Sequence, residues 1–165
     1  MPDAVSQPPE SHREIIRPEW CDYNGHMNLA YYVLVFDHAT DAFWHNLGIG
    51  LEYRDRTDHS TFTVESHITY DQEVLESDEV RCTTQLLGFD DKRIHYFHRM
   101  YHARENYLAA TTELLGVHVD LAVRRVAPMP NDIRARLSDT LDLHRRFVPP
   151  DQVGQVISLG SRREA

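Results

Sequence analysis

Residues 20–48 have the sequence WCDYNGHMNLAYYVLVFDHATDAFWHNLG, the most informative stretch of the chain. Its second part has the apolar periodicity of one helical face, formed by Leu29, Tyr32, Val33, Phe36, Thr40, Phe43 and Leu47. Asn28 suits the N-cap of this helix and Gly48 suits its end. The stretch therefore predicts a helix of about five turns that packs one side against a sheet.

The segment immediately before this helix contains Asp22, Gly25, His26 and Asn28 within seven positions. The start of a helix carries backbone N–H groups without intrahelical partners, and these groups favour negative charge. An enzyme of acyl transfer can use them to stabilise an oxyanion. A single Asp or Asn at this place is most often only a cap. The combination of the four residues favours an active site.

These residues also follow a family signature, in the pattern Asp22-x-x-Gly25-His26-x-Asn28-x-x-Tyr31. The pattern resembles that of hotdog-fold acyl-CoA thioesterases of the 4-hydroxybenzoyl-CoA type, and the resemblance covers residues 15–130. It implies an α+β hotdog fold, in which a five-stranded antiparallel sheet wraps around one long helix. The longer run over residues 18–28, together with residues 39–43, is similar to the betainyl-CoA thioesterases of bacterial carnitine breakdown.

The resemblance implies hydrolysis of a small acyl-CoA, with betainyl-CoA as the favoured substrate. Coenzyme A is then part of the substrate, and no cofactor is expected. A general small or aromatic acyl-CoA thioesterase is the alternative within the same class. Outside it, the alternatives are a hotdog hydratase or dehydratase and a non-catalytic acyl-CoA-binding protein.

In this interpretation Asp22 either activates a water molecule or attacks the thioester carbonyl itself, and the sequence leaves both routes open. Backbone N–H groups around Asn28 and Leu29 would hold the oxyanion, at the positions that the family uses. His26 could orient the substrate or only stabilise the turn. Glu65 could supply a second polar group across a subunit interface, or could simply lie on a solvated strand face.

Aromatic residues are abundant around the motif. A trimethylammonium acyl group would be bound by ring faces, although aromatics at helical spacing more often belong to a core. Gly25 would let the backbone approach the ligand, because it has no Cβ. The candidate substrate-binding residues are Trp20, Tyr23, Gly25, Tyr31, Tyr32 and Phe36.

Length and composition limit the protein class. A chain of 165 residues with 41% hydrophobic and 26% charged residues fits one globular domain. The net charge of −9 argues against a nucleic-acid partner. No apolar run approaches the about 18 residues of a membrane span, and the first nine residues do not resemble a signal peptide. We therefore expect a cytoplasmic protein without a membrane partner.

Cysteine and metal chemistry are not expected. Cys21 and Cys82 are the only cysteines, and the carboxylate next to Cys21 would raise the pKa of its thiol. The eleven histidines form no known metal-binding spacing, including His38 and His45 on the predicted helix.

The rest of the chain shows alternating patterns that predict strands, joined by breaks short enough to require antiparallel neighbours. The expected strands lie at about residues 13–19, 61–70, 80–86, 94–102 and 108–119, with a polar loop at 52–59 and a short terminal helix from Asn131. Residues 1–11 are expected to be disordered, 12–142 to form the domain and 143–165 to be a flexible tail. One helix covers only one face of such a sheet, so we expect a homodimer or homotetramer.

Overall fold

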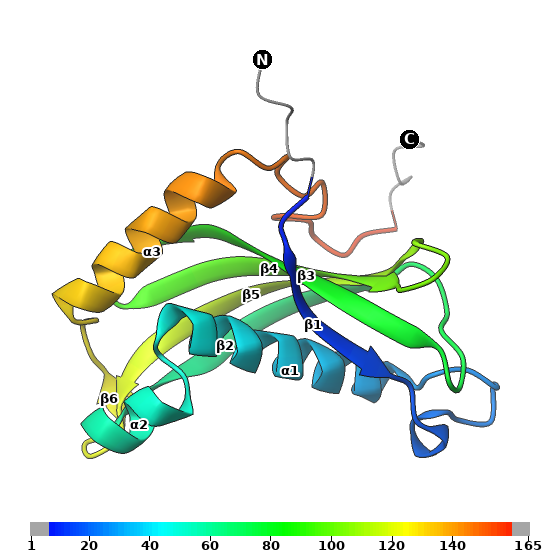
Figure 1. The fold of residues 1–165 in the computed structure, drawn as a ribbon, viewed down its shortest axis with the longest axis horizontal. Helices are drawn as coiled ribbons and strands as arrows, with labels where there is room; N and C mark the ends of the chain where they lie inside the picture. The colour runs from blue at the N-terminus through cyan, green and yellow to red at the C-terminus, as the bar shows by residue number, and fades with distance from the viewer. Residues whose placement is uncertain (1–6, 160–165) are drawn as a thin grey trace.

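The computed structural model describes residues 7–159. Its antiparallel sheet has the strand order β1-β3-β4-β5-β2 and curves around the long helix α1 (Figure 1). The bounds are β1 Glu10–Ile15, β2 His59–Tyr70, β3 Glu79–Phe89, β4 Arg93–His102 and β5 Leu108–Asp120. A short sixth strand, β6 (Arg125–Val126), pairs with the end of β5. The predicted sheet around one long helix is confirmed, with this one strand added.

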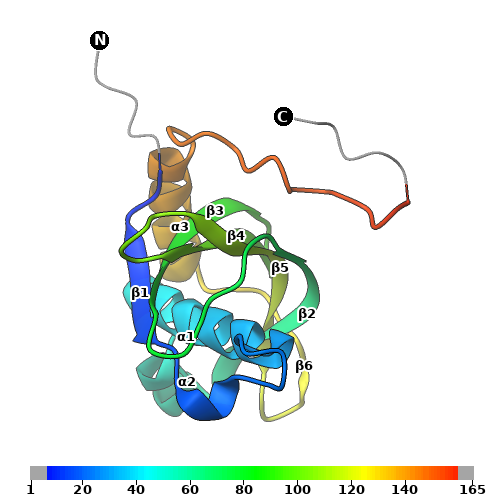
Figure 2. The same cartoon turned by 90° about the vertical axis from the view of Figure 1, so that its right-hand side faces the viewer.

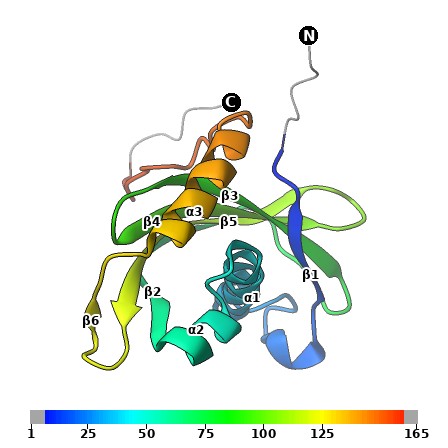
Figure 3. The ribbon, with the colours of Figure 1, turned by 60° about the vertical axis from the view of Figure 1, so that its left-hand side comes forward.

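Helix α1 (Leu29–Leu47) begins and ends where its capping residues predict. The Asn28 side chain accepts a hydrogen bond from the Ala30 N–H at 3.0 Å, and Gly48 takes a left-handed conformation with φ of 73°. The buried face is rotated relative to the prediction: Val33 is exposed, whereas Val35, Ala39 and Trp44 are buried. The rotation arises because α1 lies inside the curved sheet and also contacts β1 at its flank (Figure 2, Figure 3).

The core is divided into two clusters along α1. The cluster toward the start of the helix contains Phe36, and the other contains Phe43 and Trp44. Between them, the fully buried His98 bonds to the Thr40 and Thr84 hydroxyls, each at 2.8 Å. Burial lowers the pKa of His98 to about 3, so this core histidine is neutral.

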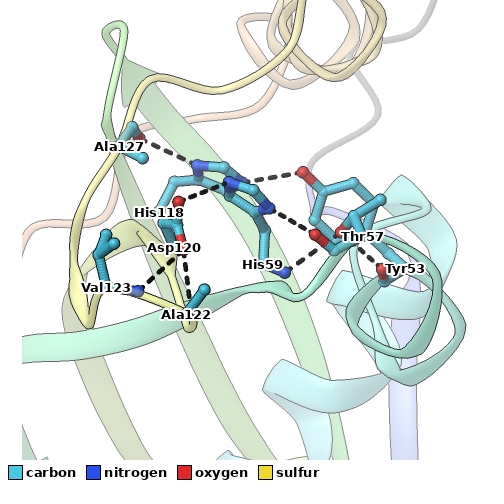
Figure 4. Close-up of polar contacts among 8 residues, drawn as sticks. All are labelled: Tyr53, Thr57, His59, His118, Asp120, Ala122, Val123 and Ala127. Carbon is cyan, nitrogen blue, oxygen red and sulfur yellow. Dashed lines mark hydrogen bonds and ion pairs between the residues drawn. The ribbon is translucent and has the colours of Figure 1, made fainter.

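Three local elements differ from the prediction. Strand β1 begins at Glu10, inside the segment expected to be disordered, and it gives way to a short 3₁₀ helix, η1 (Pro18–Trp20), where the strand was expected to continue. Helix α2 (Leu51–Thr57) replaces most of the expected polar loop. Tyr53 anchors α2, because its hydroxyl bonds to the Nε2 of the buried His118 at 2.9 Å (Figure 4).

Helix α3 (Asn131–His144) lies along the part of β3 that β1 leaves unpaired. There the Nδ1 of His144 accepts a hydrogen bond from the Leu86 N–H at 2.8 Å. The following segment also touches the sheet, since the Gly154 N–H donates to Glu113 at 2.8 Å. This contact lies within the segment expected to be a flexible tail, whereas Val156, Ile157 and Leu159 further along it are exposed. The outermost parts of the two expected flexible ends, residues 1–6 and 160–165, lie outside the described residues.

None of the helices within residues 7–159 has the length and apolar character needed to cross a membrane.

Candidate active site

The loop in front of α1 folds back on itself, so that its two ends lie side by side. Cys21 and Met27 form an isolated antiparallel bridge, and the Asn28 N–H donates to the Trp20 carbonyl at 2.9 Å. Gly25 closes the turn with φ of 81°, a left-handed conformation that favours glycine. The loop therefore holds its side chains in fixed positions at the start of the helix.

Asp22 is the carboxylate of this loop. Its Oδ2 accepts a hydrogen bond from the Asn28 side-chain amide at 2.9 Å, and its Oδ1 accepts one from the Asn24 N–H at 2.9 Å. These bonds, the Asn28 bond first, lower the pKa of Asp22 below the usual aspartate range. The carboxylate is thus ionised, oriented and partly exposed to solvent at neutral pH.

The first turn of α1 leaves one backbone donor for a ligand. The Asn28 N–H bonds to Trp20 and the Ala30 N–H bonds to the Asn28 side chain. As the first helical residue, Leu29 has no intrahelical acceptor for its N–H, and no other acceptor is found among the described residues. Of the two residues expected to supply oxyanion donors, only Leu29 thus has an N–H that is not already bonded.

A cleft of about 220 Å³ opens at this end of the helix. It is lined by His26, Met27, Leu29, Tyr32, Tyr70, Asp71, Gln72 and Glu73. The volume is below that of pockets for drug-sized ligands, about 300 Å³ and more, and suits a small acyl group. His26 Nδ1 lies 3.0 Å from the Met27 carbonyl, which fixes Nδ1 as the donor. In the neutral ring, Nε2 is then the acceptor.

The predicted aromatic residues are spread over different environments. Tyr32 lines the cleft, where it meets Tyr70 edge to face at 5.2 Å. Trp20 is buried and stacks on Tyr31 at 5.5 Å. The remaining two do not line the cleft either: Phe36 packs in the core against His98, and Tyr23 is almost fully exposed. Of the proposed ring residues, the cleft thus includes Tyr32 alone.

The opposite wall of the cleft was not predicted. It comes from Tyr70 and the acidic loop of Asp71, Gln72 and Glu73, which follows β2. The Met27 N–H donates to the Val74 carbonyl at 2.9 Å and fixes this loop against the motif. The contact joins segments far apart in the chain, so no local signal could have identified these residues.

Two other residues considered from the sequence lie away from the cleft lining. Glu65 is exposed on the edge strand β2 and does not line the cleft within this chain. Its expected role requires a second subunit and stays a prediction. Cys21 has a thiol whose pKa is raised by burial and by the nearby acids Glu76 and Asp22. This shift disfavours the thiolate that a nucleophile would need.

Comparisons with known proteins identify thioesterases in sequence and a CoA-bound protein in structure. The chain matches the Thioesterase-like superfamily over residues 16–137. It is 39% identical to a betainyl-CoA thioesterase of Pseudomonas aeruginosa, over 94% of this chain and 98% of that protein. It is 34% identical to an L-carnitine dehydrogenase/betainyl-CoA thioesterase of Rhizobium meliloti, over 85% of this chain but 28% of that longer protein. A hypothetical protein of Staphylococcus aureus in complex with CoA shares the fold, with a TM-score of 0.85 and 24% identity over 94% of this chain and 99% of that one.

Proposed function

The chain belongs to the Thioesterase-like superfamily and has the hotdog fold, and from this premise we propose that it hydrolyses betainyl-CoA to betaine and coenzyme A. The observation that carries the proposal is the ionised Asp22 carboxylate, held at the start of α1 by the Asn28 side chain. Asp22 itself does not line the small cleft of aromatic and acidic residues, which opens at the same end of the helix. The similarity to a betainyl-CoA thioesterase over nearly the whole chain supports the choice of substrate.

The proposed chemistry uses residues at the start of α1 alone. Asp22 takes a proton from water as the water oxygen attacks the thioester carbonyl, or Asp22 attacks first and water hydrolyses the resulting anhydride. The carbonyl oxygen becomes an oxyanion that the Leu29 N–H stabilises; one such donor contributes about 3 kcal/mol to the transition state. In the first route the C–S bond then breaks, and the coenzyme A thiolate takes from Asp22 the proton that came from water. In the second route the C–S bond breaks as the anhydride forms, and a proton of the water that hydrolyses the anhydride goes to the thiolate. No cofactor enters this scheme.

The composition of the cleft favours a cationic acyl group. The rings of Tyr32 and Tyr70 offer negative π-faces to a trimethylammonium group. Burial raises the pKa of Tyr32 to about 12, so its ring remains a neutral phenol. Asp71 and Glu73 add negative charge at the opposite wall. A neutral acyl group of the same size would not be attracted electrostatically by the ring faces or by the carboxylates.

A thiol-release assay with a panel of acyl-CoAs tests the reaction class. We expect free coenzyme A from betainyl-CoA, with lower kcat/KM for acetyl-CoA and benzoyl-CoA. Loss of the enoyl absorbance of crotonyl-CoA without thiol release would instead indicate a hydratase. Binding of betainyl-CoA without turnover would indicate a non-catalytic acyl-CoA-binding protein, and a higher kcat/KM for benzoyl-CoA would indicate an aromatic acyl-CoA thioesterase.

We also propose that the chain works as a dimer or a tetramer through the edge strand β2. This strand pairs only with β5 among the described strands, and Phe62 and Val64 on it are 41% and 57% exposed. An unpaired apolar edge favours association with a second copy. Such a contact would also bring Glu65 to the interface, where its expected role becomes possible.

Light scattering at micromolar concentration tests the assembly. The expected mass is twice or four times the 19.2 kDa of one chain, and Val64→Lys should shift it toward the monomer. A wild-type mass of 19.2 kDa would contradict the proposal.

The setting that we propose is carnitine breakdown in the cytoplasm. The Rhizobium meliloti relative carries an L-carnitine dehydrogenase and a betainyl-CoA thioesterase name on one chain, which supports this pathway. Both cysteines are free thiols, as is usual in a reducing compartment.

A further inference from the structure

A cluster of His12, Glu14 and His38 lies outside the cleft of the active site. The His12 Nε2 and the His38 Nδ1 both contact the same carboxylate oxygen, Oε2 of Glu14, at 3.0 and 2.7 Å. The three atoms all lie within 4.8 Å of one another. Two imidazole nitrogens and one carboxylate oxygen thus converge on one small volume.

The fold builds this cluster from two elements. His12 and Glu14 are two positions apart on β1, so their side chains lie on the same face of the strand. Their pairing partners on β3 are Cys82 and Val80, which are both buried in the core cluster that α1 covers. His38 comes from α1. The cluster therefore sits between the edge strand and the helix.

The donor set matches a divalent transition metal such as Zn²⁺. Imidazole nitrogen and carboxylate oxygen bind Zn²⁺ at about 2.0–2.2 Å, which places tetrahedral ligand atoms about 3.3–3.5 Å apart. The observed distances of 3.0 and 2.7 Å need to lengthen by about 0.3–0.5 and 0.6–0.8 Å, and the two nitrogens, which lie within 4.8 Å of each other, have to reach the same separation. The second oxygen, Oε1, lies 3.9 Å from Arg17, which leaves Oε2 for the metal.

A metal ion from solution can reach the three ligand side chains. The side chains of His12, Glu14 and His38 are 23%, 13% and 35% exposed. They are thus partly desolvated, yet an ion can reach them, and three protein ligands leave a fourth position for water.

We propose that His12, Glu14 and His38 form a binding site for a divalent transition metal of the Zn²⁺ class. The bound metal ties the edge strand β1 to α1. This role is separate from thioester hydrolysis and does not depend on the function proposed above.

The test uses the full chain without an affinity tag, freed of metal by a chelator. Calorimetric titration with Zn²⁺ should show one tight site per chain, and saturation should raise the melting temperature by about 5 °C or more. Co²⁺ should give visible absorption bands of the intensity typical of tetrahedral coordination. His38→Gln should weaken Zn²⁺ binding at least tenfold and abolish these Co²⁺ bands.

His95 provides a matched control. It lies 2.7 Å from Glu113 in a histidine–carboxylate pair, but this pair belongs to no cluster of three potential ligands among the described residues. His95→Gln should bind Zn²⁺ like the wild type. His12→Gln removes the second imidazole ligand, which lies on β1. Equal melting temperatures of the metal-free proteins establish that the variants fold.

The proposal is overturned if the wild type shows no saturable Zn²⁺ site, or if His38→Gln and His12→Gln bind Zn²⁺ as tightly as the wild type does.

Discussion

The two ends of α1 carry similar polar residues in opposite environments. At its start, Asp22 is partly exposed and His26 lines the cleft. Beyond its other end, His118 is 1% exposed and is bonded on both ring nitrogens, to Tyr53 and to the Ala127 carbonyl, each at 2.9 Å (Figure 4). Burial lowers the pKa of His118. The comparison indicates that polar groups at the first end are available for chemistry, whereas those at the second stabilise the fold.

Asp22→Asn, at the start of α1, should have the largest effect on activity. The amide oxygen can keep one of the two hydrogen bonds, from the Asn24 N–H or from the Asn28 amide, but its NH2 group cannot accept the other and cannot act as a base or a nucleophile. We expect a loss of about 10²–10⁴-fold in kcat, with the free energy of unfolding lowered by at most about 1.5 kcal/mol through the one lost hydrogen bond. Asp139→Asn, an exposed acid on α3, is the control and should change neither quantity. Activity of Asp22→Asn within about threefold of the wild type would remove Asp22 from the mechanism.

Trp44→Ala, near the other end of α1, should lower the stability of the protein and leave its activity unchanged. Trp44 is 7% exposed and packs against Tyr96 with ring centroids 4.9 Å apart. Its removal should lower the free energy of unfolding by about 3–5 kcal/mol, as measured by denaturant titration. Well below the melting temperature, kcat/KM should stay near that of the wild type. The exposed Leu51 serves as control, since Leu51→Ala should be nearly neutral.

The buried His98 should make the stability of the protein depend on pH. The pKa of His98 is about 3 in the folded protein and about 6.5 in the unfolded chain. The unfolded state therefore binds a proton that the folded state does not, and stability is lost as the pH falls from about 6.5 toward 3. Between pH 7.5 and 5.5 this histidine alone should lower the free energy of unfolding by about 1.4 kcal/mol. Equal stability at the two pH values would contradict a neutral buried His98.

Tyr53→Phe should change the stability of the protein and leave its activity unchanged. It removes the hydroxyl that bonds to His118 and leaves a buried ring nitrogen without that partner. We expect a loss of about 1–3 kcal/mol in the free energy of unfolding and no change in kcat. Tyr23→Phe, on a ring that is 97% exposed, should change stability by less than about 0.5 kcal/mol. A loss of kcat in Tyr53→Phe would mean that the two ends are coupled.

The same comparison explains what could be predicted from the sequence. The bounds of α1 and the position of Asp22 follow from local signals, namely the Asn28 cap, the Gly48 end and the motif between them. Helix α2 was missed because Tyr53 is its only buried residue, and its anchor His118 is remote in the chain.

The wall of the cleft and the contact of His12, Glu14 and His38 were missed for a related reason. Tyr70 reaches the motif, and His12 reaches His38, only through the packing of β2, β1 and α1. The expectation of no metal site was based on spacing along the chain, and spacing cannot reveal ligands that separate elements bring together. The Trp20 and Phe36 rings were expected in a substrate cage, and the structure buries both in the core. Phe36 lies on the face of α1 that packs against the sheet, and Trp20, at the end of η1, joins the same core cluster.

The most direct test of the account compares two substrates that differ in charge and hardly in shape. Betainyl-CoA carries a trimethylammonium group where tert-butylacetyl-CoA carries a neutral tert-butyl group. If the cleft between α1 and the loop after β2 binds the acyl group, kcat/KM of the wild type should be about thirtyfold higher for betainyl-CoA, because the cation alone gains about 2 kcal/mol from the rings. Equal kcat/KM for the two substrates would contradict a cation-binding acyl site at the start of α1.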